Sequence, residues 1–571
     1  MLKLIWTLLL ITASLISQTS YAQQHQAAIA TAHPLATQAG FDILNQGGNA
    51  FDAAVAISAA LAVVEPTGSG LGGGGFWLLH RAHDGFEVMV DGRETAPSQA
   101  DQDMYLNQHG QFDKAKSLNG PLAAAIPGVP AALDYLANNF GKLPLKTSLA
   151  PAIHYAETGF KIGEHYRKLA QFRLNALIDS PASATIFLDN NHVPDVNRLL
   201  IQTDLANTLR QLAQSGRDGF YQGDIAAKLV ADVQKHGGIW TLDDLANYTI
   251  KLRQPIKGSF QGYTITSSAL PSSGGIALLS MLNQLEVLPF TQADPVQRKH
   301  LISEVMRRAY YDRSRYMGDS DFIAVPTQKL ISKNYSQQLA SSIDLEHASD
   351  LSSFTQPLDQ NKGEDTTHFS VIDQYGNRVS ATLSINYPFG SGFVPAGTGV
   401  LLNDEMDDFS AKTGTENVYG LLGSSANAIE ANKRPLSSMT PTFVENDNQL
   451  MILGTPGGSR IITMVLLGIL DFIEDKSAQE IVRSPRFHHQ YSPNSIQVES
   501  SGFSDNELNQ LKRYGHDIKP LDRQYGNMQV IIFDKTTQQL SAASDPRGEG
   551  QAAIRQITVL PLHPDALEIN P

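Results

Sequence analysis

The sequence predicts an α+β fold in which antiparallel strand pairs alternate with helices. Three hairpins carry the prediction: "HFSVID" with "RVSATLSI", "TFVEN" with "LMILGT", and "MQVIIFD" with "QLSAAS". Apolar and polar residues alternate in these segments, and short turns such as "QYGN" separate the partners. Helical segments lie between the hairpins at 459–475 and 504–515, the second opening with a capping box of Ser504 and Glu507. Strand pairs with inserted helices favour a layered antiparallel fold.

The first 22 residues resemble a secretory signal peptide. Lys3 precedes an apolar run at 4–16, and the small residues Ser20 and Ala22 have the spacing of a signal peptidase site. The alternative is an uncleaved membrane anchor, but the apolar run is short for a membrane span. We therefore expect cleavage after Ala22 and an exported protein, periplasmic or secreted, with no membrane attachment after signal removal.

The remaining elements follow from periodicity and from breaker residues. In chain order the sequence predicts two helices within 37–64 separated by Gly47-Gly48, a hairpin of 76–80 with 86–92, mostly helix from 120 to 260, a strand at 262–268 and helix from 274 to 317. We find no internal repeat.

The amino-acid composition and net charge limit the classes of function that this protein can have. The chain of 571 residues is 42% hydrophobic, and its net charge of −14 disfavours nucleic acid and anionic membranes as partners. The length allows three or four domains, or one or two large ones. Because the chain has no cysteine, disulfides, thiolate metal sites and cysteine nucleophiles are excluded.

Three motifs have structural interpretations that outweigh functional ones. The run "GSGLGGGGF" contains a formal G-x-G-x-x-G, but it follows a helix and enters a strand, so we expect a tight loop with close backbone approach. We interpret "RRAYYDRSRY" as a solvated helix with stacked arginines and tyrosines. His488-His489 has no acidic or histidine partner at ligand spacing, so we expect a structural role, no metal and no cofactor.

Thr366 lies at the start of a predicted core strand in "EDTTHFSVID". An internal threonine is a poor nucleophile. If the chain is cut before it, its new α-amine, with a pKa of about 7.7–8.0, can act as the general base for its own hydroxyl. No G-x-S-x-G or H-E-x-x-H occurs to support an ordinary serine hydrolase or zinc protease.

Several longer motifs together resemble the γ-glutamyltranspeptidase (glutathione hydrolase) family. They are "GGNAFDAAVA", "LGGGGF", "DGRETAP", "AAIPGVPAAL", "PSSGGIALL", "DTTHFSVID", "LLNDEMDDFS", "NKRPLSSMTPT" and "GTPGGSRI". The resemblance covers nearly everything after the signal peptide. It implies an αββα four-layer sandwich of the N-terminal-nucleophile hydrolase type. It also implies self-cleavage at Asp365–Thr366 into a large subunit (23–365) and a small catalytic subunit (366–571) that form one intertwined globular domain.

The resemblance also assigns roles to individual residues. Thr366 would attack the γ-carbonyl of glutathione or another γ-glutamyl compound, and water or an acceptor amino acid or dipeptide would resolve the ester. The resemblance implies that Ser384, at a position where many relatives have threonine, supports Thr366, and that Gly457 and Gly458, ahead of a helix beginning near Ser459, form the oxyanion hole. It implies that the substrate α-carboxylate is bound by Arg93, Ser437 and Ser438. It further implies that the substrate α-ammonium is bound by Glu405, Asp408 and Asn386, and that Tyr419 lies in a lid loop.

Three alternatives remain beside this interpretation. A cephalosporin (glutaryl) acylase of the same fold would take a side chain without an α-amine and would have less use for an acid at Asp408. A poly-γ-glutamate-processing relative is a second alternative. A non-catalytic exported binding protein is the third, and it would not need the polar groups gathered here.

Overall fold

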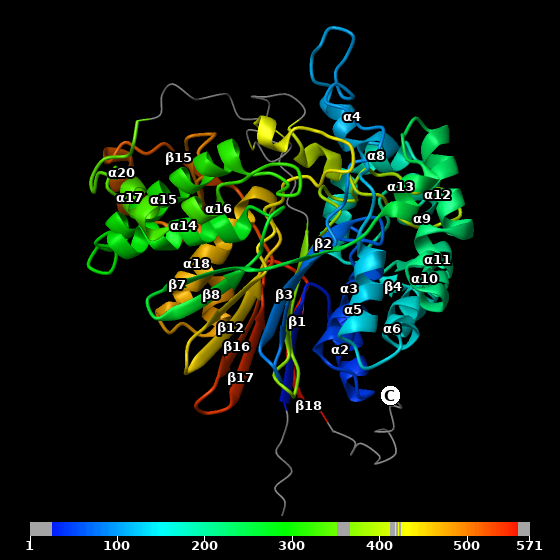
Figure 1. Ribbon diagram of the computed structural model, residues 1–571, viewed down its shortest axis with the longest axis horizontal. Coiled ribbons are helices and arrows are strands. Elements are labelled where there is room, and N and C mark those ends of the chain that lie inside the picture. Colours follow the sequence, from blue (N-terminus) through cyan, green and yellow to red (C-terminus); the bar gives the residue numbers. More distant parts are fainter. Residues whose placement is uncertain (1–25, 351–365, 411–416, 418–420, 422–423, 558–571) are drawn as a thin grey trace, which may run out of the picture.

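Two antiparallel sheets form the centre of the molecule (Figure 1). The computed structural model describes residues 26–350, 366–410, 417, 421 and 424–557. The expected signal peptide, Asp365 and Tyr419 lie outside the described residues.

The larger sheet has seven strands, and its centre carries the hairpin that follows Thr366. Its order is β18 (Gln551–Gln556), β1 (Gln26–Thr31), β9 (Thr367–Ile372), β10 (Arg378–Ser384), β2 (Gly74–Arg81), β3 (Phe86–Asp91) and β6 (Lys251–Arg253). The second sheet has six strands, in the order β17 (Gln539–Ser544), β16 (Gln529–Asp534), β12 (Gln449–Gly454), β11 (Thr442–Glu445), β8 (Tyr263–Ser267) and β7 (Ile256–Phe260). Smaller sheets join β13 (Phe487–His488), β14 (Ile496–Glu499) and β15 (Ile518–Leu521), and β4 (Phe160–Lys161) with β5 (Leu199–Leu200).

Helices cover the outer face of each sheet (Figure 1). On the side of the seven-stranded sheet, where α2 and α3 pack on the strands, lie α2 (Pro34–Asn45), α3 (Ala50–Val64), α4 (Lys114–Leu118), α5 (Val129–Asn139), α6 (Leu145–Thr158), α7 (Glu164–Phe172), α8 (Leu174–Ile178), α9 (Pro181–Phe187), α10 (Thr203–Ser215), α11 (Asp218–Tyr221), α12 (Gly223–Lys235) and α13 (Leu242–Asn247). On the side of the six-stranded sheet lie α14 (Gly274–Val287), α15 (Pro295–Tyr316), α16 (Thr327–Leu330), α17 (Lys333–Ala340), α18 (Ile461–Ile473), α19 (Ala478–Arg483) and α20 (Asp505–Arg513).

Successive side chains of the seven-stranded sheet point to opposite faces and pack into two separate hydrophobic cores. In β2, Phe76 and Leu78 belong to the core that also contains residues of the six-stranded sheet. Trp77 and Leu79 belong to the core under α3, where Trp77 Nε1 donates to Ser58 Oγ at 3.1 Å. The central strands, including β9, are therefore buried on both faces.

The prediction of a mixed fold with antiparallel sheets is confirmed. The three C-terminal hairpins appear as β9–β10, β11–β12 and β16–β17, and the N-terminal hairpin as β2–β3. The helix pair within 37–64 and the capping box of Ser504 with Glu507 are also present. The sequence analysis missed β1 and β18, which pair with each other although they lie at opposite ends of the chain.

The glycine run before β2 forms the expected closely packed loop. A β-carbon at Gly72 would lie 2.1 Å from Leu401 O, and one at Gly73 would lie 2.2 Å from Ser384 O. Backbone therefore approaches backbone where only glycine fits, next to the end of β10.

Gly454, the last residue of β12, marks another close approach near the same strands. A β-carbon there would lie 2.2 Å from His368 Cε1, and His368 is fixed by a 2.8 Å hydrogen bond between its Nδ1 and Thr382 Oγ1. Gly454→Ala is therefore expected to displace the His368 ring and to lower the free energy of unfolding by about 1–3 kcal/mol. Chemical denaturation measures this; an unchanged unfolding midpoint would contradict the packing argument.

Candidate active site

Most of the residues that the sequence analysis selected line one cavity. Its lining consists of Arg93, Thr366, Ser384, Asn386, Glu405, Asp408, Leu421, Ser437, Ser438, Met439, Gly458, Ser459 and Ile461. Gly457 precedes Gly458 in the chain, and Tyr419 lies outside the described residues.

Thr366 and Ser384 face each other across the central hairpin. The register of β9 and β10 pairs Thr367 with Leu383, which places Thr366 opposite Ser384. The two hydroxyl oxygens are 3.3 Å apart, and Asn386 N–H donates to Ser384 Oγ at 2.8 Å. Thr366 is buried, with 6% of its surface exposed, so its hydroxyl is held at the cavity wall with a polar partner.

Gly457 and Gly458 have backbone conformations that L-residues rarely adopt. Their φ angles are 135° and 56°, and both therefore favour glycine. A 3₁₀ turn runs from Gly458 to Arg460, and α18 begins only at Ile461, so the expected helix start near Ser459 was too early. No acceptor among the described residues takes a hydrogen bond from the N–H of Gly457 or Gly458. Gly458 can therefore offer a backbone donor to the cavity that Thr366 lines.

Arg93 connects the two acids of the predicted substrate site. Its Nη1 lies 2.7 Å from Glu405 Oε2 and its Nη2 lies 2.5 Å from Asp408 Oδ2. Arg93 Nε donates to Pro435 O at 3.2 Å, which fixes the plane of the guanidinium group. The side chain of Arg93 is 1% exposed and that of Asp408 is 13% exposed. This wall of the cavity therefore presents one cation between two acids.

Burial perturbs the acids around Arg93. Burial raises the pKa of Glu405 to about 7, and the nearby Arg93 opposes this only in part. Burial, reinforced by Glu405, raises the pKa of Glu94 well above its usual range. Near neutral pH, Glu405 is consequently a group whose charge responds to small changes in pH.

The predicted amide and hydroxyl ligands are partly engaged by the protein. Asn386 has a φ of 72° and donates from Nδ2 to Asp404 O at 3.0 Å. Ser437 Oγ accepts from Met439 N–H at 3.0 Å. These contacts fix the loops, while the side chains of Asn386 and Ser437 still line the cavity.

Arg313 of α15 is a neighbouring residue that the sequence analysis did not select. Its Nη2 donates to Ser438 Oγ at 3.3 Å and its Nε donates to Ser273 Oγ at 3.0 Å. Arg313 is 6% exposed, and no carboxylate of the described residues lies within ion-pair distance of it. A buried guanidinium group without a carboxylate adds positive potential near this wall of the cavity.

The interpretation of "RRAYYDRSRY" as a solvated helix was wrong for half of its surface. Arg307, Tyr310 and Arg313 are buried, because this side of α15 packs against the C-terminal part of the chain. Arg315 remains exposed and stacks on Tyr311, as expected. The single signal in the sequence was the mixture of arginine and tyrosine, which does not say which face is buried.

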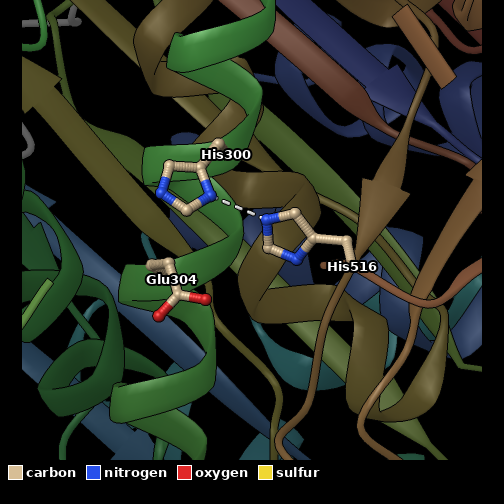
Figure 2. A group of neighbouring side chains, drawn as sticks. All are labelled: His300, Glu304 and His516. Atoms are coloured by element: carbon tan, nitrogen blue, oxygen red, sulfur yellow. Dashed lines mark hydrogen bonds between the residues drawn. The ribbon is translucent and has the colours of Figure 1, made fainter. Parts of the chain in front are cut away.

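His300, Glu304 and His516 form a cluster whose ligand atoms lie within 4.8 Å of one another (Figure 2). His300 Nε2 lies 2.8 Å from Asp344 O, so this nitrogen donates and His300 Nδ1 accepts from His516 Nε2 at 2.7 Å. Burial, reinforced by His300, lowers the pKa of His516 to about 3, so the pair is neutral at pH 7.

Glu304 in this cluster is already neutralised by two arginines. Its Oε2 lies 2.6 Å from Arg308 Nη1 and its Oε1 lies 3.2 Å from Arg307 Nη2. Two guanidinium groups disfavour a further cation beside the same carboxylate, so we interpret the group as a hydrogen-bonded cluster. His488 and His489 bond to Thr463 and Asn494, respectively, contacts that fit the structural role expected for them.

Comparison with known proteins identifies the family. The family description "Gamma-glutamyltranspeptidase" matches residues 36–555. The chain is 41% identical over 534 residues to the glutathione hydrolase proenzyme of Escherichia coli (strain K12), covering 91% of this chain and 90% of that protein. Among the described helices, none is long and apolar enough to cross a membrane.

Solved structures of two activities resemble the fold. The cephalosporin acylase from Bacillus halodurans has a TM-score of 0.81 at 28% identity and covers 94% of this chain and 99% of its own. The Helicobacter pylori γ-glutamyltranspeptidase has a TM-score of 0.55 at 38% identity and covers 58% of this chain and 96% of its own. With a family match over most of its length and a relative of 41% identity, the chain belongs to the γ-glutamyltranspeptidase (glutathione hydrolase) family of enzymes.

Proposed function

We propose that this protein cleaves the γ-glutamyl amide bond of glutathione and related compounds through an ester on Thr366. The observation that carries the proposal is the shared cavity, in which the Thr366 hydroxyl, a glycine N–H and the Arg93–Asp408 pair line one space. A γ-glutamyl transfer enzyme needs a buried hydroxyl beside groups that can bind the α-carboxylate and α-ammonium of its substrate.

The same proposal includes the fold and the maturation of the protein. The fold would be the four-layer αββα sandwich of an N-terminal-nucleophile hydrolase, and the chain would mature by cutting itself. The chain would cut itself at Asp365–Thr366, leaving residues 23–365 and 366–571 as one intertwined domain. The relative named a proenzyme supports processing. The sheet order supports a lasting association, because β9 and β10 of the second piece lie between β1 and β2 of the first. Export to the periplasm or medium, with removal of residues 1–22, belongs to the proposal too.

In the reaction, the freed α-amine of Thr366 takes the proton from Oγ1 as this oxygen bonds to the γ-carbonyl carbon. The negative charge on the carbonyl oxygen is stabilised by the N–H groups of Gly457 and Gly458. The carbon–nitrogen bond then breaks and the departing amine receives the proton, leaving a γ-glutamyl ester. Water or the amine of an acceptor amino acid or dipeptide attacks this ester and restores Thr366, while Ser384 holds the hydroxyl in place.

Substrate recognition would be an exchange of ion pairs. In the structure Arg93 is bonded to Asp408 and Glu405. A bound γ-glutamyl group would offer its α-carboxylate to Arg93, Ser437 and Ser438 and its α-ammonium to Asp408 and Glu405, with Asn386 and the Tyr419 lid completing the enclosure. Each internal charge then keeps a partner, so binding does not leave a buried charge unpaired.

Because the pKa of Glu405 is raised, we expect the affinity of the cavity for a ligand with an α-ammonium group to depend on pH. Since burial raises this pKa to about 7, Glu405 is neutral below pH 7 and attracts an ammonium group only above it. We expect the inhibition constant of L-glutamate to fall severalfold as the pH rises from 6 to 8. Competitive inhibition measured against pH checks this, and the slope is expected to be lost in Glu405→Gln. A slope of equal size in Glu405→Gln would assign the titration to another group, such as the Thr366 amine.

Arg313 is expected to contribute to binding rather than to folding. Arg313→Met removes the donor to Ser438 and the positive potential near the α-carboxylate, and a charged hydrogen bond contributes about 1.5–3 kcal/mol. We expect KM for a γ-glutamyl anilide to rise about tenfold or more. Because the variant also removes a buried cation without a carboxylate partner, the melting temperature is expected to stay equal or rise. A melting temperature lowered in parallel with activity would indicate a structural role alone.

The fold is shared with a cephalosporin acylase, and we take a glutaryl amide as the competing substrate. The two substrates share the terminal carboxylate that Arg93 would bind and differ by the α-ammonium group that Asp408 would bind. The test is the hydrolysis of γ-glutamyl-p-nitroanilide against glutaryl-p-nitroanilide. We expect kcat/KM to favour the γ-glutamyl compound by at least about 10²-fold; a preference for the glutaryl compound would establish the acylase instead.

A further inference from the structure

A cavity at the opposite end of β9 from Thr366 has a lining without any acidic residue. The turns that follow β2 and β9, the first turn of α3 and the end of α5 with the segment after it form this lining. Its basic residues are Arg81, His83 and Lys142. Because β9 has six residues and a strand rises about 3.3 Å per residue, about 20 Å separates this cavity from Thr366. In a chain with a net charge of −14, such a lining favours an anionic ligand.

Lys142 is the cation of this lining that has no acidic partner. Its side chain is exposed, and its Nζ lies 4.0 Å from the centre of the Tyr375 ring. Among the described residues, no carboxylate lies within ion-pair distance of Nζ. Arg81, in contrast, is paired with Asp84 through Nε–Oδ1 at 3.0 Å and Nη2–Oδ2 at 2.7 Å. Lys142 is therefore the group that can attract an anion from solvent.

Gln374 contributes a buried amide oxygen to the same cavity. The residue is 8% exposed, and its Oε1 accepts no hydrogen bond from the part of the chain that the structure describes. The other buried amides of the lining are engaged, since Asn377 Oδ1 accepts from Ala82 N–H at 2.9 Å and Asn49 Nδ2 donates to Phe140 O at 2.7 Å. A buried acceptor without a donor costs free energy, which a ligand with an N–H or O–H group would recover.

Two aromatic rings lie beside these polar groups. Tyr375 follows Gln374 in the turn after β9 and is 43% exposed. Phe140 is half-buried and is supported from below by Phe51, with the two ring centroids 5.4 Å apart. Both Tyr375 and Phe140 line the cavity. They offer flat apolar surface on which the ring of a ligand can pack.

We infer that this cavity binds a small aromatic carboxylic acid that carries a neutral N–H or O–H group. Lys142 binds the carboxylate, Gln374 Oε1 accepts a hydrogen bond from the neutral donor, and the ring packs against Tyr375 and Phe140. Because the lining has no carboxylate, a ligand with an ammonium group is disfavoured. In this preference the cavity differs from the one lined by Arg93 and Asp408, and the inference does not depend on the γ-glutamyl activity.

The test compares two fluorescent probes that differ in one charge. They are 2-aminobenzoate and 2-aminobenzamide, and their binding to the full protein is measured by fluorescence anisotropy. The wild-type protein is expected to bind 2-aminobenzoate more tightly. Lys142→Glu reverses the charge at the cavity wall and is expected to lower the ratio of the two association constants by at least about threefold. Lys161→Glu, the same change at an exposed lysine outside the lining, is the matched control and is expected to keep the wild-type ratio.

A second variant tests the amide oxygen by a different readout. Gln374→Leu removes the acceptor and is expected to weaken the binding of 2-aminobenzoate about two- to tenfold. Benzoate lacks the amine, so its affinity, measured by displacement of 2-aminobenzoate, is expected to stay unchanged. Because the variant removes a buried polar atom without a partner, the melting temperature is expected to stay equal or rise. A lower melting temperature with equal losses for both ligands would mean that Gln374 has a structural role alone.

Competition with L-glutamate locates the bound probe. L-Glutamate at saturation would occupy the cavity lined by Arg93 and is expected to leave the binding of 2-aminobenzoate unchanged. Release of the probe by L-glutamate would place it in the active site and overturn the inference. An unchanged ratio in Lys142→Glu, an equal change in Lys161→Glu, or a wild-type protein that shows no saturable binding of 2-aminobenzoate would overturn it as well. Hydrolysis of a γ-glutamyl anilide, measured separately, decides the proposed function.

Discussion

Thr366→Ala is expected to yield one uncut chain without γ-glutamyl hydrolase activity. The substitution removes both the hydroxyl that would start self-cleavage and the nucleophile of the mature enzyme, so turnover should fall by at least about 10⁴-fold. The wild-type protein should separate on a denaturing gel into pieces of about 37 and 22 kDa, scaled by length from 62.0 kDa. N-terminal sequencing of the smaller piece should read Thr-Thr-His-Phe-Ser.

Thr366→Ser is the matched control, because it keeps the hydroxyl and, after cleavage, the α-amine. It should still be cut and should retain measurable activity, lowered by the freer rotation of a side chain that lacks the methyl group. Thr367→Ala tests the specificity of the assignment, since Thr367 neighbours Thr366 but pairs with Leu383. Cleavage and turnover that persist in Thr366→Ala would contradict the mechanism, as would a wild-type protein that is active while uncut.

The positions of Thr366, Ser384 and the two glycines could be predicted from the sequence, because each depends on neighbouring residues in the chain. The turn between β9 and β10 fixes the hairpin register, and that register sets Ser384 opposite Thr366. The need for glycine at Gly457 and Gly458 also follows from local backbone angles. The spacing of Arg93 and Asp408 along the chain does not indicate that they lie together. Their roles came from the family resemblance, and only the packing of the chain shows the ion pair.

Other features depend on long-range packing that no local pattern contains. The strand β1 is rich in alanine and pairs with β18 at the far end of the chain, so neither β propensity nor neighbouring turns indicate it. Arg313 lies in a helix with arginine and tyrosine on several faces, and its burial depends on the loop that carries Ser438. Lys168 and Phe172 of α7 have a helical spacing in the sequence, but their place with Thr366 in the lining of one cavity is a property of the tertiary structure.

Asp408→Asn is expected to reduce discrimination between γ-glutamyl and glutaryl substrates. Asparagine keeps the size of the side chain but loses the charge that would attract the α-ammonium, and a hydrogen bond to a charged group contributes about 1.5–3 kcal/mol. The ratio of kcat/KM for γ-glutamyl-p-nitroanilide to that for glutaryl-p-nitroanilide should therefore fall by about 10–100-fold. The loss should be larger for the γ-glutamyl compound, because the glutaryl compound has no ammonium group.

The neighbouring acid separates this effect from a general disturbance of the segment. Asp407 accepts a hydrogen bond from Ser117 Oγ at 2.7 Å and does not line the cavity. Asp407→Asn should consequently lower thermal stability while keeping the substrate ratio of the wild-type protein. Asp408→Asn also leaves Arg93 with Glu405 and Glu94 as its remaining acidic partners among the described residues, so some loss of stability is expected there as well. The substrate ratio is therefore the decisive quantity: an equal loss for both anilides in Asp408→Asn would mean that Asp408 orders Arg93 without contacting the substrate ammonium.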